Sequence, residues 1–101
     1  MIRVIIEREL KSDCYDEYVA LISNTKREAG RFAGFLGGEL FRDIDNSERI
    51  FVISHWNTLN DWLHWAESHE RKVMMQGLAL LLKTEERVAV LESFGDSAYE
   101  G

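Results

Sequence analysis

The stretch from Ser54 to Arg71, SHWNTLNDWLHWAESHER, contains all three tryptophans and all three histidines of the chain. It follows an apolar segment and predicts the end of a strand followed by a helix. Thr58 is a typical N-cap residue, and Asp61 three positions later completes a capping box. Ser68 predicts a second N-cap, so the helical region should break there and restart at His69. We expect this stretch to form one wall of any ligand pocket.

The rest of the chain predicts four strands and one further helix. Apolar patterning and turn residues predict strands over residues 2–10, 35–43, 49–56 and 87–94. Apolar residues at helical spacing predict a helix that begins after Ser12 or Asp13 and ends near Ala29. The helix that restarts at His69 should continue to about Thr84. The pair Gly37-Gly38 predicts a bulge or a close backbone contact in the second strand.

The resulting order, βαββαβ, predicts a ferredoxin-like α+β plait: a four-stranded antiparallel sheet with the helices on one face. Residues 1–101 should form a single domain, with a core over about 2–94 and a polar tail over 95–101. Adjacent apolar pairs, such as Ile5-Ile6 and Phe51-Val52, indicate strands that are buried on both faces. No further helix is available as cover, so we expect a homodimer with its sheets packed face to face.

Composition excludes several classes of partner. The net charge of −6 offers no basic face for nucleic acid or for an anionic membrane surface. No apolar run approaches the roughly 18 residues that span a bilayer. The N-terminus does not have the pattern of a signal peptide, and Cys14 is a lone cysteine, so we expect a cytoplasmic protein. No metal site is predicted, because the pair His69-Glu70 has no second ligand four residues later.

A Gly-Phe pair at residues 34 and 35 stands before the tryptophan-rich stretch quoted above. In this combination the chain resembles the antibiotic biosynthesis monooxygenase domain, over roughly residues 2–94. In that family a Gly-Phe pair opens the second strand, a tryptophan ends the third, and a short helix carries an aromatic residue and a tryptophan before a serine and charged residues. The matching residues here are Gly34-Phe35, Trp56, Trp62, Trp65, Ser68 and His69 to Arg71. The resemblance implies a dimeric α+β barrel. It also implies small-molecule chemistry: some members oxygenate anthrones or quinols without metal or flavin, and others degrade haem.

Haem chemistry is the least favoured of these alternatives. The haem-degrading branch has an asparagine where this chain has Glu7 and a haem-ligating histidine where it has Met75. Methionine can bind haem iron, but methionines at helical spacing are more typical of a core. We therefore expect no cofactor.

The spacing of the second helix separates its two tryptophans. Leu59, Trp62, Leu63 and Ala66 form the core stripe, and Trp65 lies at its margin. Trp65 either packs in a broad core or lines a cavity between helix and sheet, as the tryptophan at this position does in the family. A flat indole there could stack on an aromatic substrate.

The candidate bases are His55 and Glu7. A strand histidine could remove a phenolic proton near neutral pH, although it is more often simply hydrogen-bonded. A carboxylate at Glu7 that faced an apolar cavity would have a raised pKa. The competing interpretations are pairing with Arg42 or Arg87 on a neighbouring strand and exposure to solvent at the end of the strand. His69, which opens the next helix near the expected pocket mouth, is a candidate substrate-binding residue.

A wide apolar arc follows from Val73 to Leu82 and forms either a pocket wall or a subunit contact. Its candidate substrate-binding residues are Met74, Met75 and Leu78. Together these features predict a monooxygenase that acts on a small electron-rich aromatic, such as a quinol or an anthrone. The alternative is a non-catalytic module that binds a small ligand on the same scaffold.

Overall fold

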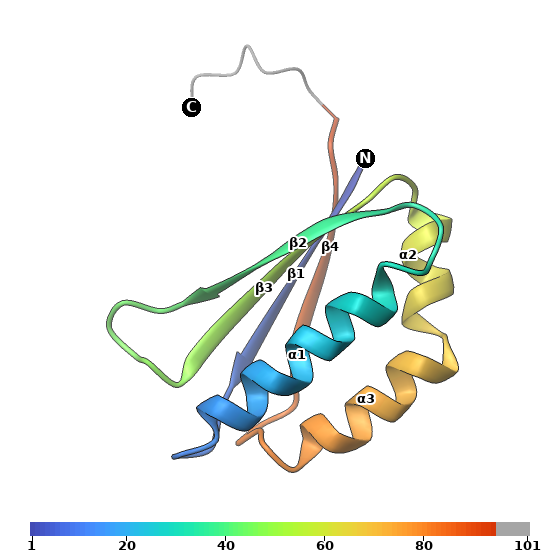
Figure 1. Ribbon diagram of the computed structural model, residues 1–101. Coiled ribbons are helices and arrows are strands. Elements are labelled where there is room, and N and C mark those ends of the chain that lie inside the picture. Colours follow the sequence, from blue (N-terminus) through green and yellow to red (C-terminus); the bar gives the residue numbers. More distant parts are fainter. Residues whose placement is uncertain (95–101) are drawn as a thin grey trace.

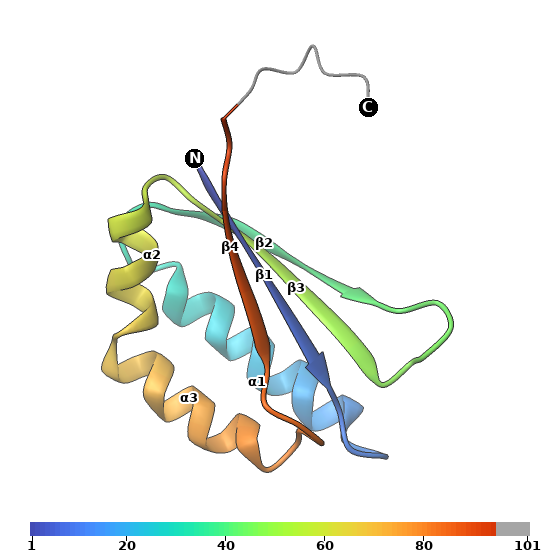
Figure 2. The same ribbon diagram turned by 180° about the vertical axis from the view of Figure 1, so that it is seen from behind.

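The computed structural model describes residues 1–94, which form one sheet and three helices (Figure 1). In chain order the elements are β1 (Ile2–Glu9), α1 (Tyr15–Ala29), β2 (Phe35–Arg42), β3 (Arg49–Trp56), α2 (Leu59–Ala66), α3 (His69–Ala79) and β4 (Arg87–Glu92). The strands pair antiparallel in the order β2-β3-β1-β4. All three helices lie on one face of the sheet (Figures 1 and 2). The predicted ferredoxin-like plait is confirmed.

The break between α2 and α3 depends on two side-chain caps. The Oγ1 atom of Thr58 accepts the backbone N–H of Asp61 at 3.1 Å, and the Oγ atom of Ser68 accepts that of Arg71 at 3.1 Å. Each cap satisfies a backbone donor that the first turn of a helix leaves free. The predicted caps and the predicted break are therefore confirmed.

The start of α1 differs from the prediction. The N-cap residue is Cys14, which makes no side-chain capping bond. Asp13 has a φ of 63°, which is not the extended conformation of an N-cap. The hydroxyl of Ser12 donates to the carboxylate of Glu48 at 3.0 Å instead. Neither predicted residue can cap the helix, because one has the wrong backbone conformation and the other has a different partner.

The end of α3 also differs, since the helix stops at Ala79 rather than near Thr84. The next residues leave the helix to bond with the end of β1: the N–H of Lys11 donates to the carbonyl of Leu81 at 2.8 Å, and Leu82 pairs with Leu10 in an isolated bridge. These bonds replace helical ones. Strand β4 likewise ends at Glu92, two residues before the predicted end, and the predicted polar tail lies outside the described residues.

The second strand contains the predicted irregularity. The register between β2 and β3 shifts between Phe35 and Gly37, and Gly37 has a φ of 129°. This conformation suits glycine because a side chain is strained there. The shift changes which residues of β2 share a face with their neighbours on β3.

The core between helices and sheet is divided into two clusters. One gathers around the tryptophans and contains Ile2, Val4, Ile6, Ala29, Trp56, Trp62 and Trp65. The other lies toward the opposite end of the sheet and contains Leu10, Tyr18, Ile50, Met74, Leu78 and Leu82. Even-numbered residues of β1 supply the first cluster, and Leu10, directly after the strand, supplies the second, because alternate residues share the face against the helices.

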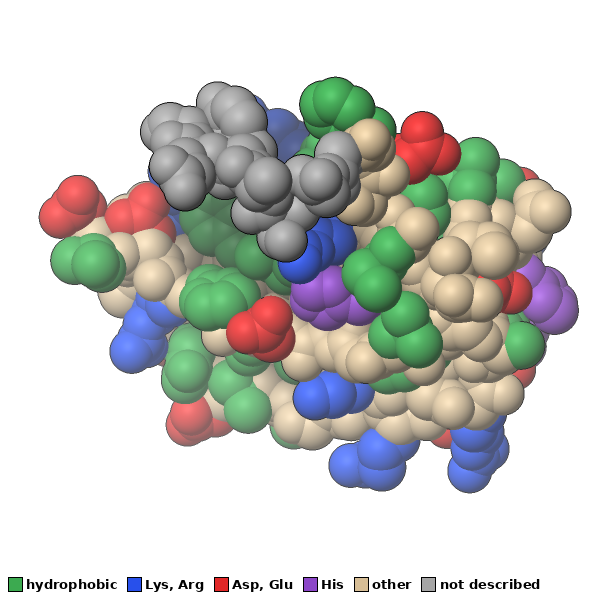
Figure 3. All heavy atoms as spheres, turned by 90° about the horizontal axis from the view of Figure 1, so that it is seen from above, with side chains coloured by type: hydrophobic (Ala, Val, Ile, Leu, Met, Phe, Trp, Pro, Cys, Tyr) green, Lys and Arg blue, Asp and Glu red, His purple; other side chains and the backbone are tan. Residues whose placement is uncertain are grey.

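The other face of the sheet has no described helix over it. Directly paired residues share a face. The register therefore places Ile5 and Ile53 together at its centre, with Phe51, Phe41 and Leu91 around them. Figure 3 shows the molecule from above, with hydrophobic side chains between charged ones. Phe41 and Leu91 are almost half exposed. This open sheet face therefore has large apolar side chains at its centre, where a face in contact with water usually has polar ones.

Candidate functional site

A cavity of about 230 Å³ lies between the helices and the sheet. Its walls come from both core clusters: Ile6, Ala29 and Trp65 belong to the first, and Met74 belongs to the second. Exposed residues of α1 and β2, such as Lys26 and Leu40, mark its mouth. The cavity is therefore a pocket that opens between α1 and the edge strand and extends into the core.

Aromatic side chains form one wall. Phe35, Trp56, Trp62 and Trp65 all line the cavity. Trp56 contacts Phe35 and Trp62 edge to face, with ring centroids 5.1 and 5.9 Å apart, and Trp65 contacts Phe32 in the same way at 5.1 Å. Such contacts hold each ring in one orientation. The wall therefore presents both faces and edges of packed aromatic rings to the cavity.

One buried hydrogen bond fixes the central ring of this wall. The Nε1–H group of Trp56 donates to the hydroxyl of Ser54 at 3.1 Å, and both residues are buried. The two residues lie two positions apart on β3 and therefore share the helix-side face. A buried indole N–H needs such a partner. Ser54 also lines the cavity and adds a hydroxyl to an otherwise apolar wall.

Two arginines that line the cavity share one carboxylate. Arg8 donates from Nε to the Oε1 atom of Glu86 at 2.9 Å, and Arg71 donates from Nη2 to its Oε2 atom at 2.7 Å. The Arg71 guanidinium also lies 5.7 Å from the ring centroid of Trp62, which is cation–π range. We refer to Arg8, Glu86 and Arg71 as the arginine bridge.

Two acidic groups at the arginine bridge have shifted pKa values. Burial by itself raises the pKa of Glu86, but the Arg8 charge and the contacts with Arg71 outweigh it and hold the pKa below its usual value. The hydroxyl of Tyr18 accepts from Arg8 at 3.0 Å. Burial raises the pKa of Tyr18, and the nearby Arg8 offsets only part of that rise. Glu86 is therefore ionised and Tyr18 neutral near pH 7.

The structure brings two of the predicted substrate-binding residues together. Trp65 and Met74 both line the cavity, and both are buried. Met75 and Leu78 pack in the second core cluster instead. His69 is exposed at the start of α3 and does not line the cavity. A helix presents only one stripe to a given neighbour, which separates these residues of α3.

His55 lies on the open sheet face, across the sheet from the cavity. Its neighbour Trp56 is in the cavity wall, and adjacent strand residues point to opposite faces. Its Nε2 atom is 3.6 Å from the Oε1 atom of Glu39. A proton that moved from a substrate in the cavity to this imidazole would have to cross the sheet.

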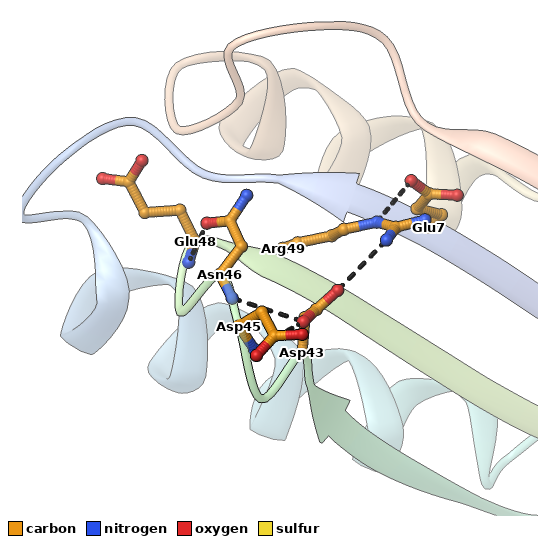
Figure 4. Close-up of polar contacts among 6 residues, drawn as sticks. All are labelled: Glu7, Asp43, Asp45, Asn46, Glu48 and Arg49. Carbon is orange, nitrogen blue, oxygen red and sulfur yellow. Dashed lines mark hydrogen bonds and ion pairs between the residues drawn. The ribbon is translucent and has the colours of Figure 1, made fainter.

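Glu7 lies on the same open face, and the raised pKa expected for it is wrong. Its carboxylate accepts from the Nε atom of Arg49 at 2.9 Å, and the same guanidinium donates to Asp43 at 3.0 Å (Figure 4). The hydrogen bond from Arg49 holds the pKa of Glu7 below its usual value. Arg49 is thus its partner, rather than Arg42 or Arg87. Strand alternation turns Glu7 away from the apolar cavity.

The arginine bridge is the part of the site that pattern reading missed. Arg8 was the available signal, because it continues the buried stripe of Ile2, Val4 and Ile6 on β1. A charge at such a position needs a buried partner. Glu86 had no comparable signal, since it lies in a loop and meets the arginines only in the folded chain.

Within residues 1–94, no group of three or more His, Cys, Asp and Glu residues is placed to hold a metal ion. Among the helices over the same residues, none is long and apolar enough to cross a membrane.

A single plait of one antiparallel sheet and three helices, with a pocket between the two layers, defines a ferredoxin-like α+β protein. The sequence model of the antibiotic biosynthesis monooxygenase family matches residues 1–77. The chain therefore belongs to that family. No curated protein sequence matches it significantly.

Solved structures share this fold at low sequence identity. A protein from Deinococcus radiodurans, assigned to the antibiotic biosynthesis monooxygenases, has a TM-score of 0.87 at 13% identity, with 100% of both chains covered. A protein from Methanosarcina mazei Go1 has a TM-score of 0.85 at 17% identity, with 92% of each chain covered. SnoaB from Streptomyces nogalater, described as a cofactor-independent oxygenase, has a TM-score of 0.84 at 12% identity, with 97% of each covered. At these identities the likeness concerns the fold.

Proposed function

We propose that this protein is a monooxygenase that acts on a small electron-rich aromatic, such as a quinol, without a metal, flavin or haem cofactor. The observation that carries the proposal is the aromatic-walled cavity, in which Trp65 and Met74 line a space of about 230 Å³. Membership of the monooxygenase family supports the reaction class. The oxygenase SnoaB, which has the same fold, supports chemistry without a cofactor.

The cavity size favours a substrate with one or two rings. An apolar cavity of about 150 Å³ holds benzene, whereas drug-sized ligands occupy about 300–1,000 Å³. A volume of about 230 Å³ lies between these cases. A quinol therefore fits the space better than a three-ring anthrone.

The quinol itself can supply every electron that the reaction needs. One oxygen atom of O₂ enters the ring as a hydroxyl, the other leaves as water, and the quinol ends as a hydroxyquinone. The protein has to bind the deprotonated ring, orient it and exclude water. Trp65 would contact the ring, and such aromatic contacts contribute about 0.5–1.5 kcal/mol beyond area burial.

We propose that neither His55 nor Glu7 takes the proton from a substrate in this cavity. Both lie on the open sheet face, and Glu7 is already paired with Arg49. Glu39 is the one carboxylate among the described lining residues, but its side chain is 62% exposed and lies beside His55.

This lack of a base favours a second candidate function, a module that binds an aromatic ligand without converting it. The same cavity would serve both functions, so the fold does not distinguish them.

We also propose a homodimer that packs the open sheet faces together. Ile5, Ile53 and Phe51 form an apolar centre on that face, with no described helix over it. A domain of this size also gains from a second subunit, because it buries a small share of its surface alone.

Oxygen consumption with a panel of quinols tests the enzyme against the binder. We expect saturable consumption that falls about tenfold in kcat/KM in Trp65→Phe, which corresponds to about 1.4 kcal/mol of lost contact. His55→Ala should keep activity within about twofold. Unchanged circular dichroism of both variants serves as the folding control.

Two results would change these assignments. Tight binding of quinols without oxygen consumption would support the binding module. Loss of activity in a folded His55→Ala variant would restore His55 as the base.

A further inference from the structure

We infer that the cavity selects its aromatic ligand as an anion, with a phenolate or carboxylate oxygen directed at Arg71 and Arg8. The inference rests on the proposed function only for the identity of the ring as a substrate. The preference for an anionic ligand is a property of binding. It can therefore be measured as an affinity for aromatic molecules that the protein does not convert.

The arginine bridge carries a net charge of +1. Glu86 receives Arg8 at 2.8 Å on one oxygen and Arg71 at 2.7 Å on the other, so one negative charge faces two positive ones. The side chain of Arg8 is 2% exposed and that of Arg71 is 12% exposed. Water is therefore largely kept from the excess charge, and a nearby anion would feel it strongly.

Arg71 has hydrogen-bond donors to spare. A guanidinium carries five N–H groups, and the Arg71 side chain uses one of them, on Nη2, for Glu86. In the described part of the chain no buried side-chain nitrogen lacks a partner, so the other nitrogens of Arg71 are accessible. Arg71 lines the cavity, and this supplies the paired donors that bind carboxylates and phenolates.

Among the residues that the structure describes, neither the other lining residues nor the neighbours of the bridge offset this charge. Tyr18 meets Arg8 as a neutral hydroxyl. Lys26 adds a further positive charge at the mouth, where its Nζ atom donates to the carbonyl of Gly38 at 3.2 Å. The carboxylate of Glu39 lies beside His55, across the sheet. A chain with a net charge of −6 thus builds a cavity with a positive interior.

This charge gives the site a route to the reactive form of a phenol without a base in the cavity. A phenol that binds beside a guanidinium loses its proton more readily, because the positive charge favours the phenolate. The proton passes to water or buffer at the mouth, and the phenolate oxygen stays beside Arg71. The cavity would then hold the electron-rich anion that reacts with dioxygen.

Naphthoate and naphthamide form a matched pair of probes, since they share the ring and differ in charge. We expect naphthoate to bind at least tenfold more tightly near neutral pH, measured by calorimetry or by quenching of tryptophan fluorescence. The preference should disappear in Arg71→Gln. It should persist in Arg31→Gln, which removes a charge from a side chain that is 78% exposed. Equal affinity for the two probes in the unchanged protein would overturn the inference.

A second measurement needs no variant, so it holds even where Arg71→Gln does not fold. Bound para-nitrophenol should be more ionised than free para-nitrophenol at the same pH, which its visible absorbance reports. Equal or weaker ionisation of the bound form would overturn the inference. Oxygen consumption tests the enzyme proposal separately. Preference for the anion without oxygen consumption would contradict the monooxygenase function and support anion selection. Oxygen consumption without a preference for the anion would support the monooxygenase function and contradict anion selection.

Discussion

Gly34 lies directly before β2 and next to Asp61 in the first turn of α2. Its φ is 82°, and its carbonyl accepts the backbone N–H of Asn57 at 2.8 Å. A Cβ atom there would overlap the carboxylate of Asp61 and lie 2.6 Å from its Cβ atom. The backbone conformation and the close contact both require glycine. The Gly-Phe pair that opens β2 therefore has a physical reason in this fold.

Replacing Gly34 by alanine should lower the free energy of unfolding by about 1–3 kcal/mol, because the change adds strain and a clash. Gly77→Ala is the matched control. Gly77 lies inside α3, and a Cβ atom there would sit 3.9 Å from the Cδ1 atom of Leu21, an ordinary contact. We expect that variant to gain about 0.4–1 kcal/mol. Urea unfolding of both measures the difference, and equal stabilities would contradict it.

At the scale of elements, the arginine bridge connects three parts of the chain. Arg8 belongs to β1, Arg71 to α3, and Glu86 to the segment that leads into β4. The shared carboxylate therefore joins these three elements through hydrogen bonds and ion pairs in addition to their apolar packing. Breaking a buried ion pair by removing one partner leaves uncompensated charge and costs about 3–5 kcal/mol.

Glu86→Gln should therefore destabilise the protein by about 3–5 kcal/mol near neutral pH. Glu85→Gln, at an exposed neighbouring position, should change stability little. The pKa of Glu86 is lowered in the folded chain from its ordinary 4.5. Its contribution is then complete above about 4.5 and is lost as pH falls through the folded-state value.

The difference between wild type and Glu86→Gln should accordingly shrink in acid, which urea unfolding at a series of pH values measures. A difference that stays constant from neutral to strongly acidic pH would show that the carboxylate charge is not the stabilising feature.

At the scale of the whole molecule, one subunit leaves apolar surface on both sides of its edge strand. The side chains of Val88, Val90 and Leu91 on β4 are 42–47% exposed. The open sheet face adds Ile5 and Ile53 at its centre. The apolar residues of the open sheet face favour an interface between copies there.

Sedimentation at micromolar concentration should therefore give twice the chain mass of 11.7 kDa. Ile53→Asp should give a single subunit, because it places a charge at the centre of the proposed interface. Leu80→Asp is the control, since Leu80 is 72% exposed on the helix side of the molecule. A wild-type mass of one subunit would exclude the dimer.

Local patterning predicted most of the elements because their signals are local. Thr58 and Ser68 cap helices through bonds that span three residues, and strand alternation follows from the backbone itself. The end of α3 was less predictable. Leu82 leaves the helix for a bridge with Leu10, a partner 72 positions away that no local window contains.

The candidate site was predicted in part, for the same reason. Trp65 and Met74 line the cavity, which is one of the two alternatives that the helical spacing left open for each. His55 and Glu7 do not, because a strand offers two faces and only the placement of the helices decides which one borders the cavity.

The sequence by itself determined the plait, the family and the break between α2 and α3, since periodicity, caps and a tryptophan-rich motif are written in neighbouring residues. The tertiary structure alone decided which charges meet. The carboxylate of Glu86 accepts from both Arg8 and Arg71 beside the cavity, although Arg8 lies 78 positions earlier in the chain. Electrostatic energy depends on distance and burial in space, and neither can be read from spacing along the chain.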